Sequence, residues 1–225
     1  MVFKMKILVI TDVHYKWKYL KRVLKMEEYD VIVVAGDLSR WGDVKEAFDV
    51  LKTLTKHTTT FFVPGNCDNP SLLRAENVYN AINLHGKVVE HNDLVFTGIG
   101  GSNITPFNTP IEFTEDKLAE IMDQVEKNLH GKNIDIMVSH TPPYATKLDI
   151  AFSGEHVGSI KVREFLEKHQ PLICVCGHIH ESQGIDKLGR TVAINPGPIA
   201  DGKYAIVELD ERKKRIIKVE FRKIR

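Results

Sequence analysis

Five short apolar runs of the chain end in side chains that commonly bind metal ions. The segments that follow these runs are Asp12–His14, Gly36–Asp37, Gly65–Asp68, Ser139–His140 and Gly177–His180. Loops at the carboxyl ends of neighbouring strands can converge on one crevice, so residues far apart in the sequence can share one pocket. The pattern therefore predicts a metalloenzyme.

The composition is that of an ordinary globular protein. Of the 225 residues, 43% are hydrophobic and 27% are charged, and no apolar run approaches the roughly 20 residues that span a bilayer. We expect one domain over residues 1–225, because no composition break marks a linker. Three cysteines and a start without a cleavage pattern predict a cytoplasmic location. The net charge of +1 gives no general reason to expect nucleic acid but does not exclude it, and the oligomeric state stays open.

The first half of the chain alternates strand and helix patterns. Buried strands are predicted where β-branched or aromatic runs are bounded by Asp, Gly and Pro, at Ile7–Ile10, Val31–Ala35 and Thr60–Val63. A helix is expected over residues 43–54, begun by a capping box of Asp43 and Glu46. Its apolar face would comprise Val44, Ala47, Phe48, Leu51 and Leu54. Residues 87–98 then predict a β-hairpin.

The second half repeats the alternation and ends in antiparallel strands. Helices are expected from Thr114 and over Ser159–His169, with a long loop at Thr141–Gly158. The strands are expected at Ile134–Val138, Leu172–Cys176, Tyr204–Leu209 and Arg215–Phe221. The basic segments beside the last strand are interpreted as a solvated terminal hairpin. Together these elements predict an α/β fold with a mixed sheet.

Seven side chains in the five segments are suitable metal ligands, more than the three or four that one metal usually takes. They are Asp12, His14, Asp37, Asn66, His140, His178 and His180. Seven ligands indicate two divalent cations, and a bridging carboxylate would offset the repulsion between them. Asp37, in the middle of the set, is the candidate bridge. A mixture of carboxylate, amide and imidazole without thiolate favours Mn, Fe, Zn or Ni over a structural zinc.

The order and spacing of these segments resemble the calcineurin-like metallophosphoesterase family, whose pattern is D-x-H, G-D, G-N-H-D, a later S-H or G-H, and G-H-x-H. All five blocks occur in order between Asp12 and His180. The resemblance implies a β-sandwich of two mixed sheets with helices on both outer faces. It also implies phosphoester hydrolysis by a metal-bound hydroxide, without a covalent enzyme intermediate, on a small phosphorylated substrate.

The resemblance also implies how the ligands divide between the two cations. Asp12, His14 and His180, with bridging Asp37, would hold one. Asn66, His140 and His178, with the same Asp37, would hold the other. Asn66 and His140 would also border the reacting phosphate.

One position departs from the family pattern. Cys67 stands where many members carry the His of G-N-H-D, and small members with Cys there look more like phosphodiesterases. A thiol is a poorer hydrogen-bond donor than an imidazolium, so we expect Cys67 to give the leaving group little help. Asp68 is expected to fix the loop. His156, in a segment that resembles a loop overhanging the metals, is a candidate phosphate contact.

The favoured interpretation is a dinuclear phosphodiesterase acting on small molecules. A phosphomonoesterase and a nuclease are the alternatives among enzymes, although a nuclease would need a basic, aromatic groove to bind nucleic acid. A protein-binding scaffold that retains the fold is the alternative of another class. Intact ligands at every metal position argue against such a scaffold.

The remaining histidines and cysteines have ordinary structural interpretations. His57, His91, His130 and His169 are expected on the surface or in the core. His85, which follows an Asn-rich helical pattern, is expected at the surface. Cys174 and Cys176 could suggest a metal pair, but buried packing is the favoured interpretation.

Overall fold

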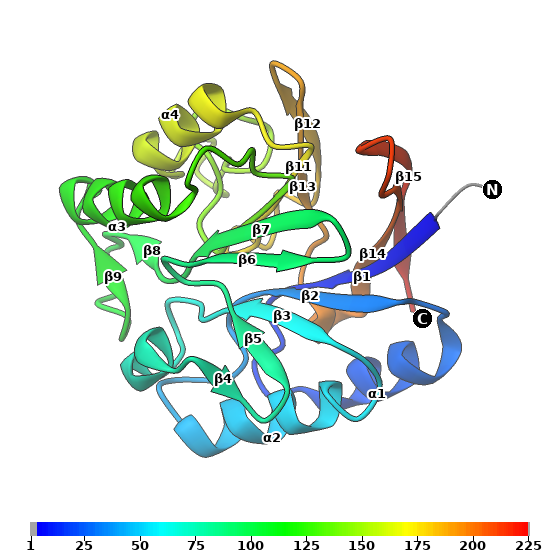
Figure 1. Cartoon of the computed structure of the whole chain (residues 1–225). Coiled ribbons are helices and arrows are strands. Elements are labelled where there is room, and N and C mark those ends of the chain that lie inside the picture. Colours follow the sequence, from blue (N-terminus) through cyan, green and yellow to red (C-terminus); the bar gives the residue numbers. More distant parts are fainter. Residues whose placement is uncertain (1–3, 225) are drawn as a thin grey trace.

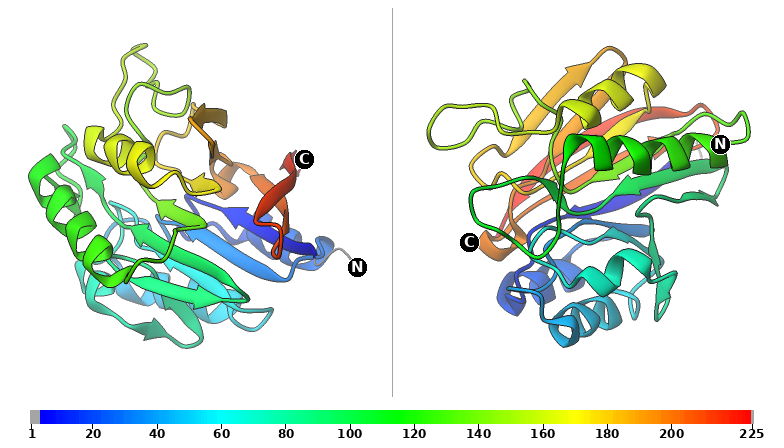
Figure 2. Two further views of the ribbon diagram at one scale, coloured as in Figure 1. Left: turned by 45° about the horizontal axis from the view of Figure 1, so that its top comes forward. Right: turned by 90° about the vertical axis from the view of Figure 1, so that its left-hand side faces the viewer.

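Two mixed β-sheets pack face to face, and a pair of helices covers the outer face of each (Figure 1). The computed structural model describes residues 4–224. Helices α1 (Trp17–Met26) and α2 (Val44–Leu54) lie on one side of the paired sheets, and α3 (Glu115–Asn128) and α4 (Ile160–His169) lie on the other (Figure 2). The sandwich of two mixed sheets flanked by helices is thereby confirmed.

Within residues 4–224 the larger sheet has seven strands in the order β15-β14-β1-β2-β3-β5-β4. They are β1 (Lys4–Ile10), β2 (Val31–Ala35), β3 (Thr60–Val63), β4 (Asn77–Val78), β5 (Ala81–Asn83), β14 (Lys203–Asp210) and β15 (Arg215–Lys223). The six-stranded sheet has the order β12-β13-β11-β10-β7-β6. Its strands are β6 (Val88–His91), β7 (Leu94–Ile99), β10 (Ile136–Ser139), β11 (Ile173–Val175), β12 (Gly184–Leu188) and β13 (Thr191–Asn195). The short strands β8 (Ser102–Asn103) and β9 (Glu112–Phe113) pair beside them.

The central strands of both sheets are parallel, and this direction positions the site. β1, β2 and β3 run parallel in the larger sheet, as do β7, β10 and β11 in the other. Parallel neighbours end at the same edge of a sheet. The loops that follow β1, β2, β3, β10 and β11 can therefore meet at one end of the sandwich.

Two-sided burial explains why the central strands read as continuous apolar runs. All five residues of β2, Val31–Ala35, are buried. One face of the larger sheet packs on α1 and α2, and its other face packs on the second sheet. Phe61 and Phe96 stack across that interface with ring centroids 4.3 Å apart. The second sheet packs its outer face on α3 and α4.

Helix α2 begins as expected, but only half of its predicted capping box forms. The Asp43 carboxylate accepts hydrogen bonds from the backbone N–H groups of Lys45 and Glu46, at 2.9 and 3.1 Å. The Glu46 side chain pairs with Arg40 instead of reaching back to Asp43. Val44 and Phe48, predicted on the apolar face, are 37% exposed and lie at its margin.

Helices α3 and α4 also begin where expected. Thr114 accepts from the backbone of Lys117 at α3, and Ser159 accepts from the backbone of Val162 at α4. The segment before His85 forms β4 and β5, so the helical pattern expected there is wrong. Among the helices of residues 4–224, none is both long and apolar enough to cross a membrane.

Candidate metal centre

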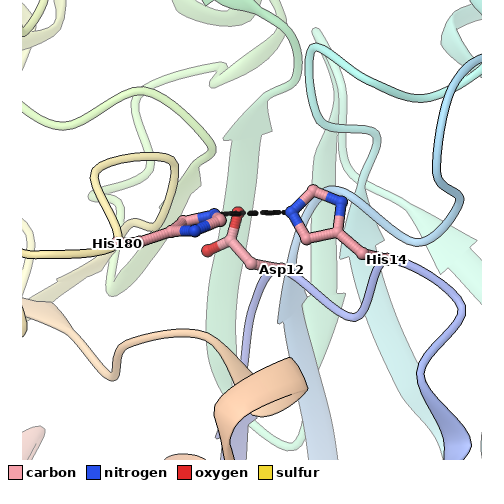
Figure 3. A group of neighbouring side chains, drawn as sticks. All are labelled: Asp12, His14 and His180. Atoms are coloured by element: carbon pink, nitrogen blue, oxygen red, sulfur yellow. Dashed lines mark hydrogen bonds and ion pairs between the residues drawn. The ribbon is translucent and has the colours of Figure 1, made fainter.

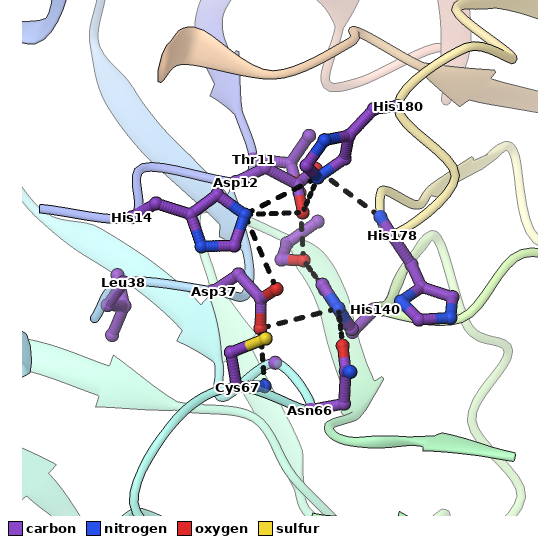
Figure 4. A network of polar contacts seen from close by, with 12 residues as sticks. Thr11, Asp12, His14, Asp37, Leu38, Asn66, Cys67, His140, His178 and His180 are labelled. Carbon is purple, nitrogen blue, oxygen red and sulfur yellow. Dashed lines mark hydrogen bonds and ion pairs between the residues drawn. The ribbon is translucent and has the colours of Figure 1, made fainter. Parts of the chain in front are cut away.

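The five predicted segments converge at one end of the sandwich (Figure 4). Asp12 and His14 follow β1, Asp37 follows β2 and Asn66 follows β3. His140 follows β10, and His178 and His180 follow β11. Both sheets therefore contribute side chains to one cluster, and the parallel direction of the strands explains why they meet.

Several of these residues adopt backbone conformations that favour glycine. The φ angles of Asp12, His14, Asp37 and His178 are 52°, 45°, 53° and 69°. Such left-handed conformations are uncommon for other residues and are kept only where the surroundings impose them. Here the backbone imposes them: Asp12 N donates to Gly36 O at 3.0 Å, and His14 N donates to Asp37 O at 2.9 Å. The loops after β1 and β2 are thus tied to each other.

Close packing at the cluster requires glycine in the loop after β3. A Cβ on Gly65 would lie 2.0 Å from Oδ1 of Asp37 and 2.2 Å from its backbone nitrogen. No side chain fits at that distance. Gly65 therefore lets the β3 loop approach Asp37 closely enough for Asn66 to reach the cluster.

Asp12, His14 and His180 form the first close group (Figure 3). Nε2 of His180 lies 3.2 Å from Oδ1 of Asp12, and Nε2 of His14 lies 4.0 Å from the same oxygen. The two Nε2 atoms are 3.4 Å apart. Burial opposes ionisation of Asp12, but the adjacent histidines, His180 above all, outweigh it and hold the pKa of the carboxyl well below its ordinary value.

Asp37 lies between this group and His140. Its Oδ2 is 3.6 Å from Nε2 of His14, and its Oδ1 is 3.5 Å from Nε2 of His140. Asp12, Asp37 and His140 are all buried, and their candidate ligand atoms lie within 4.8 Å of one another. Asp37 has the central place that a bridging carboxylate needs.

A chain of hydrogen bonds aims Asn66 at His140. The Thr109 hydroxyl donates to Glu112 at 2.6 Å, so its oxygen is free to accept from Nδ2 of Asn66 at 3.0 Å. Burial opposes ionisation of Glu112, but hydrogen bonds from Thr105 and Thr109 lower its pKa to about 2 and keep it an acceptor. Oδ1 of Asn66 consequently points at Nε2 of His140, 2.8 Å away.

The tautomer of His140 shows that a cation fits this pair. Nδ1 of His140 lies 2.6 Å from the backbone oxygen of Ala35, which can only accept, so Nδ1 carries the proton. In the neutral ring Nε2 is then an acceptor that faces another acceptor, Oδ1 of Asn66. A divalent cation held by both atoms would satisfy them. Oδ1 of Asp12 gives the same indication for the first group: it is buried and, although the imidazole of His180 lies 3.2 Å away as an ion-pair partner, the geometry makes no hydrogen bond to this oxygen among residues 4–224.

His178 lies at the edge of the cluster. Its ring is 5.1 Å from the ring of His140, between centroids, and its backbone N–H points to Asp12 Oδ2 at 3.3 Å. Burial lowers the pKa of His178 to about 4, so the imidazole is neutral and able to bind a metal at pH 7. The structure thus brings all seven predicted ligands together, with His178 the most peripheral.

Asp68 fixes the loop as expected. Its carboxylate accepts from the backbone N–H groups of Leu38, Ser39 and Gly65, at 3.1, 2.8 and 2.8 Å. It therefore ties the loop after β3 to the loop that carries Asp37. Burial, with the charge of Asp37, raises the pKa of Asp68 to about 6.

Cys67 lies at the mouth of the cluster. Its backbone N–H donates to Oδ1 of Asp37 at 2.8 Å, and its sulfur lies within 4.8 Å of ligand atoms of His14 and Asp37. Burial, with the nearby carboxylates, raises the pKa of the thiol. The surrounding protein groups therefore favour the protonated thiol.

His156 lies in a wall of the cavity beside the cluster. This cavity has a volume of about 710 Å³ and is also lined by His178 and His180. Nδ1 of His156 is 2.7 Å from Oδ1 of Asp149, a buried carboxylate that also accepts from the backbone of Ala145, Thr146 and Gly158. Asp149 thus anchors both His156 and the loop between β10 and α4.

A second, smaller cavity lies over the cluster and shares Phe107, His178 and His180 with the larger one. It has a volume of about 340 Å³, and Trp41, Phe107 and Cys67 line it with several of the ligands. Sequence reasoning missed Trp41 and Phe107, together with Asp149, Thr109 and Glu112. No local motif marks them, because their roles depend on contacts across the fold. Asp149 lies ten residues after the end of β10, inside the loop that precedes α4, and offers no such signal.

The remaining predictions have mixed outcomes. Cys174 and Cys176 are buried side chains of the core, which confirms the packing interpretation. The surface placement of His85 is wrong: it is partly buried, accepts from the backbone N–H of Gly100 at 2.9 Å and stacks on Phe113. Its burial lowers its pKa to about 4.

Comparison with solved structures supports the fold. The structure of TT1561 from Thermus thermophilus superposes with a TM-score of 0.76 at 22% identity, covering 98% of this chain and 99% of that one. A dimetal phosphatase from Danio rerio superposes with a TM-score of 0.56 at 14% identity, covering 91% and 92% of the two chains. At these identities the likeness is one of fold.

Sequence comparison identifies the family of the chain. An uncharacterized protein of Methanocaldococcus jannaschii, MJ1162, is 42% identical over 219 residues, which are 94% of this chain and 98% of that protein. The model of the calcineurin-like phosphoesterase family matches residues 5–182, a span that contains all seven candidate ligands. The chain therefore belongs to the calcineurin-like phosphoesterase family, whose metal-dependent hydrolysis of phosphoesters suits the donor set of this cluster.

Proposed function

We propose that the protein is a dinuclear-metal phosphodiesterase that acts on small molecules. The observation that carries this proposal is the central place of Asp37, with an imidazole nitrogen 3.6 Å from one of its oxygens and another 3.5 Å from the other. A carboxylate in that place can bridge two cations. Such a pair of cations clamps the attacking and leaving oxygens of an in-line displacement at phosphorus.

The candidate ligands would divide between two cations, with Asp37 shared by both. Asp12, His14 and His180, which form one close group, would hold the first cation. Asn66 and His140, whose acceptor atoms face each other at 2.8 Å, would hold the second together with His178. When bound, the cations supply Lewis acidity and lower the pKa of water enough for it to act as nucleophile near pH 7. Mn, Fe, Zn and Ni all suit these ligands.

Four side chains border the place of the phosphate: Asn66, Cys67, His140 and His156. With both ring nitrogens protonated, the imidazole of His156 can donate from Nδ1 to Asp149 and from Nε2 to a phosphate oxygen. Cys67 contributes a neutral thiol. Cations held by these ligands would therefore supply most of the charge neutralisation, and the leaving oxygen would receive little help from Cys67.

The charges around the site support a diester over a monoester or a nucleic acid. Among the described residues that line the two cavities there is no Lys or Arg, whereas Glu155 and Glu181 line the larger one. A phosphomonoester dianion would lack cationic side chains to complement its second charge, and a nucleic-acid backbone would lack a basic groove. A diester carries a single negative charge, which two cations neutralise.

Metal content and turnover test the proposal. We expect elemental analysis of the Mn²⁺-loaded protein to give about two cations per chain. The loaded protein should hydrolyse bis(p-nitrophenyl) phosphate with a higher kcat/KM than p-nitrophenyl phosphate. Two bound cations with a preference for the monoester would reject the diesterase assignment, and a stoichiometry near zero with Mn²⁺, Zn²⁺ and Ni²⁺ would reject the dinuclear centre.

A further inference from the structure

The larger cavity beside the metal centre is mainly apolar at its open side. Its lining includes Ile104, Pro106, Phe107, Phe152 and Val157, together with His178 and His180 of the cluster. Its volume of about 710 Å³ lies within the range of small-molecule sites, which are typically apolar with a few polar groups. A group that occupies it would lie directly beside the metal ligands.

The apolar side chains at this cavity are unusually exposed. Phe152 is 92% exposed, Phe107 72% and Ile104 61%. They come from two loops, since Ile104 and Phe107 follow β8 whereas Phe152 lies in the segment between β10 and α4. A single exposed apolar side chain is normal on a protein surface. Several that lie together mark a binding surface. The loops are ordered here by polar contacts, such as the hydrogen bond from Phe152 N to Glu181 at 2.8 Å.

The charges of the cavity restrict its occupant. Glu155 and Glu181 are the acidic residues that line it, and none of the described residues that line it is Lys or Arg. An anionic group would be repelled there. A neutral, apolar group joined to the phosphate matches both the lining and the charge.

We infer that this cavity is the binding site for an apolar ester arm of the substrate, either an alkyl chain or an aromatic ring, carried by the phosphodiester whose phosphate the metal centre binds. This inference rests on the proposed phosphodiesterase function. The inferred substrate is a diester whose phosphate carries two substituents, an uncharged apolar arm and a leaving group. The continuity of the cavity with His178 and His180 places that arm and the phosphate on one molecule.

A series of diesters with one leaving group tests the inference. Each carries p-nitrophenol as leaving group and a methyl, hexyl, phenyl or carboxypentyl group as the second arm. With the Mn²⁺-loaded protein, kcat/KM for the hexyl ester should exceed that for the methyl ester by about tenfold, the factor expected when roughly two methylenes leave water. The carboxypentyl ester should fall well below the hexyl ester. Equal values for methyl and hexyl would overturn the inference.

Variants of the cavity test whether its side chains cause the preference for the hexyl ester. Phe152→Ala and the double variant Phe107→Ala, Phe152→Ala should lower the hexyl-to-methyl ratio of kcat/KM towards one, with little change for the methyl ester. Phe152 is almost fully exposed, so its replacement should leave folding intact. Phe48→Ala, at the margin of the apolar face of α2 and outside both cavities, is the aromatic control and should leave the ratio unchanged. A ratio that persists in the double variant would overturn the inference.

Equilibrium binding separates this inference from the proposed function. Dimethyl phosphate and methyl hexyl phosphate react slowly, and calorimetry with the loaded protein should give about tenfold tighter binding of the hexyl compound. If the protein bound both cations but hydrolysed no diester, the proposed function would fail, and this difference in Kd would still support the apolar site. Equal Kd values would overturn it. If the two Kd values were equal and Phe152→Ala abolished binding to vesicles, the surface would be assigned to a lipid. If they were equal and Phe152→Ala abolished dimerisation, it would be assigned to a second copy of the chain.

Discussion

The metal cluster and the apolar cavity beside it are built in opposite ways. The cluster lies at strand ends, its carboxylates are buried, and backbone hydrogen bonds hold its residues in left-handed conformations. The cavity is walled by loops whose aromatic side chains project into solvent, with Phe152 92% exposed. Under the proposed function, the chemistry that depends on ligand geometry would be placed on strand ends, and the substrate contacts on loops, which can vary. Substitutions in the cluster should therefore alter metal binding and turnover, whereas substitutions in the cavity should alter substrate preference.

The largest effect is expected at Asp37. Asp37→Ala removes the proposed bridge, so both cations should be lost and kcat/KM should fall by more than the roughly 10–100-fold typical of losing an outer-shell partner. Elemental analysis and turnover of bis(p-nitrophenyl) phosphate check this. Asp123→Ala, on the exposed side of α3, is the control and should retain both. Retention of most activity in Asp37→Ala, with loss in His178→Ala, would show that the bridge is elsewhere.

Glu112 tests whether the cluster is aimed by hydrogen bonds that lie behind it. Glu112→Gln can donate to Thr109, which frees the Thr109 hydroxyl to turn and lets the Asn66 amide rotate. We expect metal affinity to weaken by about 10–100-fold, measured by competition with a chelator. Glu120→Gln, a change on the outer side of α3, should not alter it. An unchanged affinity in Glu112→Gln would mean that Asn66 needs no such orientation.

His156 lies where the cluster and the cavity meet, so it sharpens the distinction between them. His156→Ala should leave metal content intact and reduce kcat/KM for a diester by roughly 10- to 150-fold, because one charge-assisted contact to phosphate contributes about 1.5–3 kcal/mol. His57→Ala, an exposed residue remote from the strand ends, is the control. Unchanged kinetics would remove His156 from the site, whereas loss of metal would make it a ligand.

The smallest effect is expected at Cys67. A protonated thiol contributes little to the leaving group, so Cys67→Ala should change kcat/KM only a few-fold, compared with the roughly 10²–10⁴-fold that general-acid assistance typically contributes. Rates across aryl and alkyl diesters should depend steeply on the pKa of the leaving group, and Cys67→His should flatten that dependence. A hundredfold drop in Cys67→Ala with both cations retained would show that the thiol takes part in catalysis.

Much of the cluster was predictable because its signal is local. Each ligand closely follows a short buried run that is rich in β-branched residues, and strand ends are the places where side chains can leave the core and meet. The caps of α3 and α4 were predictable for the same reason, since Thr114 and Ser159 bond to backbone groups three residues away. The predicted capping contact from Glu46 to Asp43 does not form, because the Glu46 carboxylate pairs with Arg40 across the loop that precedes α2. That contact depends on how the loop folds.

The sequence by itself determined the strand ends, the family and the seven candidate ligands, because these depend on short-range patterns of burial and donor type. Only the tertiary structure decided which atoms face each other: the proton on Nδ1 of His140 is fixed by the carbonyl of Ala35, 105 residues away. It also decided that Glu112 aims Asn66, that Asp149 holds His156, and that exposed aromatic residues of two loops share one cavity. Such contacts join residues with no fixed spacing along the chain, so no local pattern encodes them.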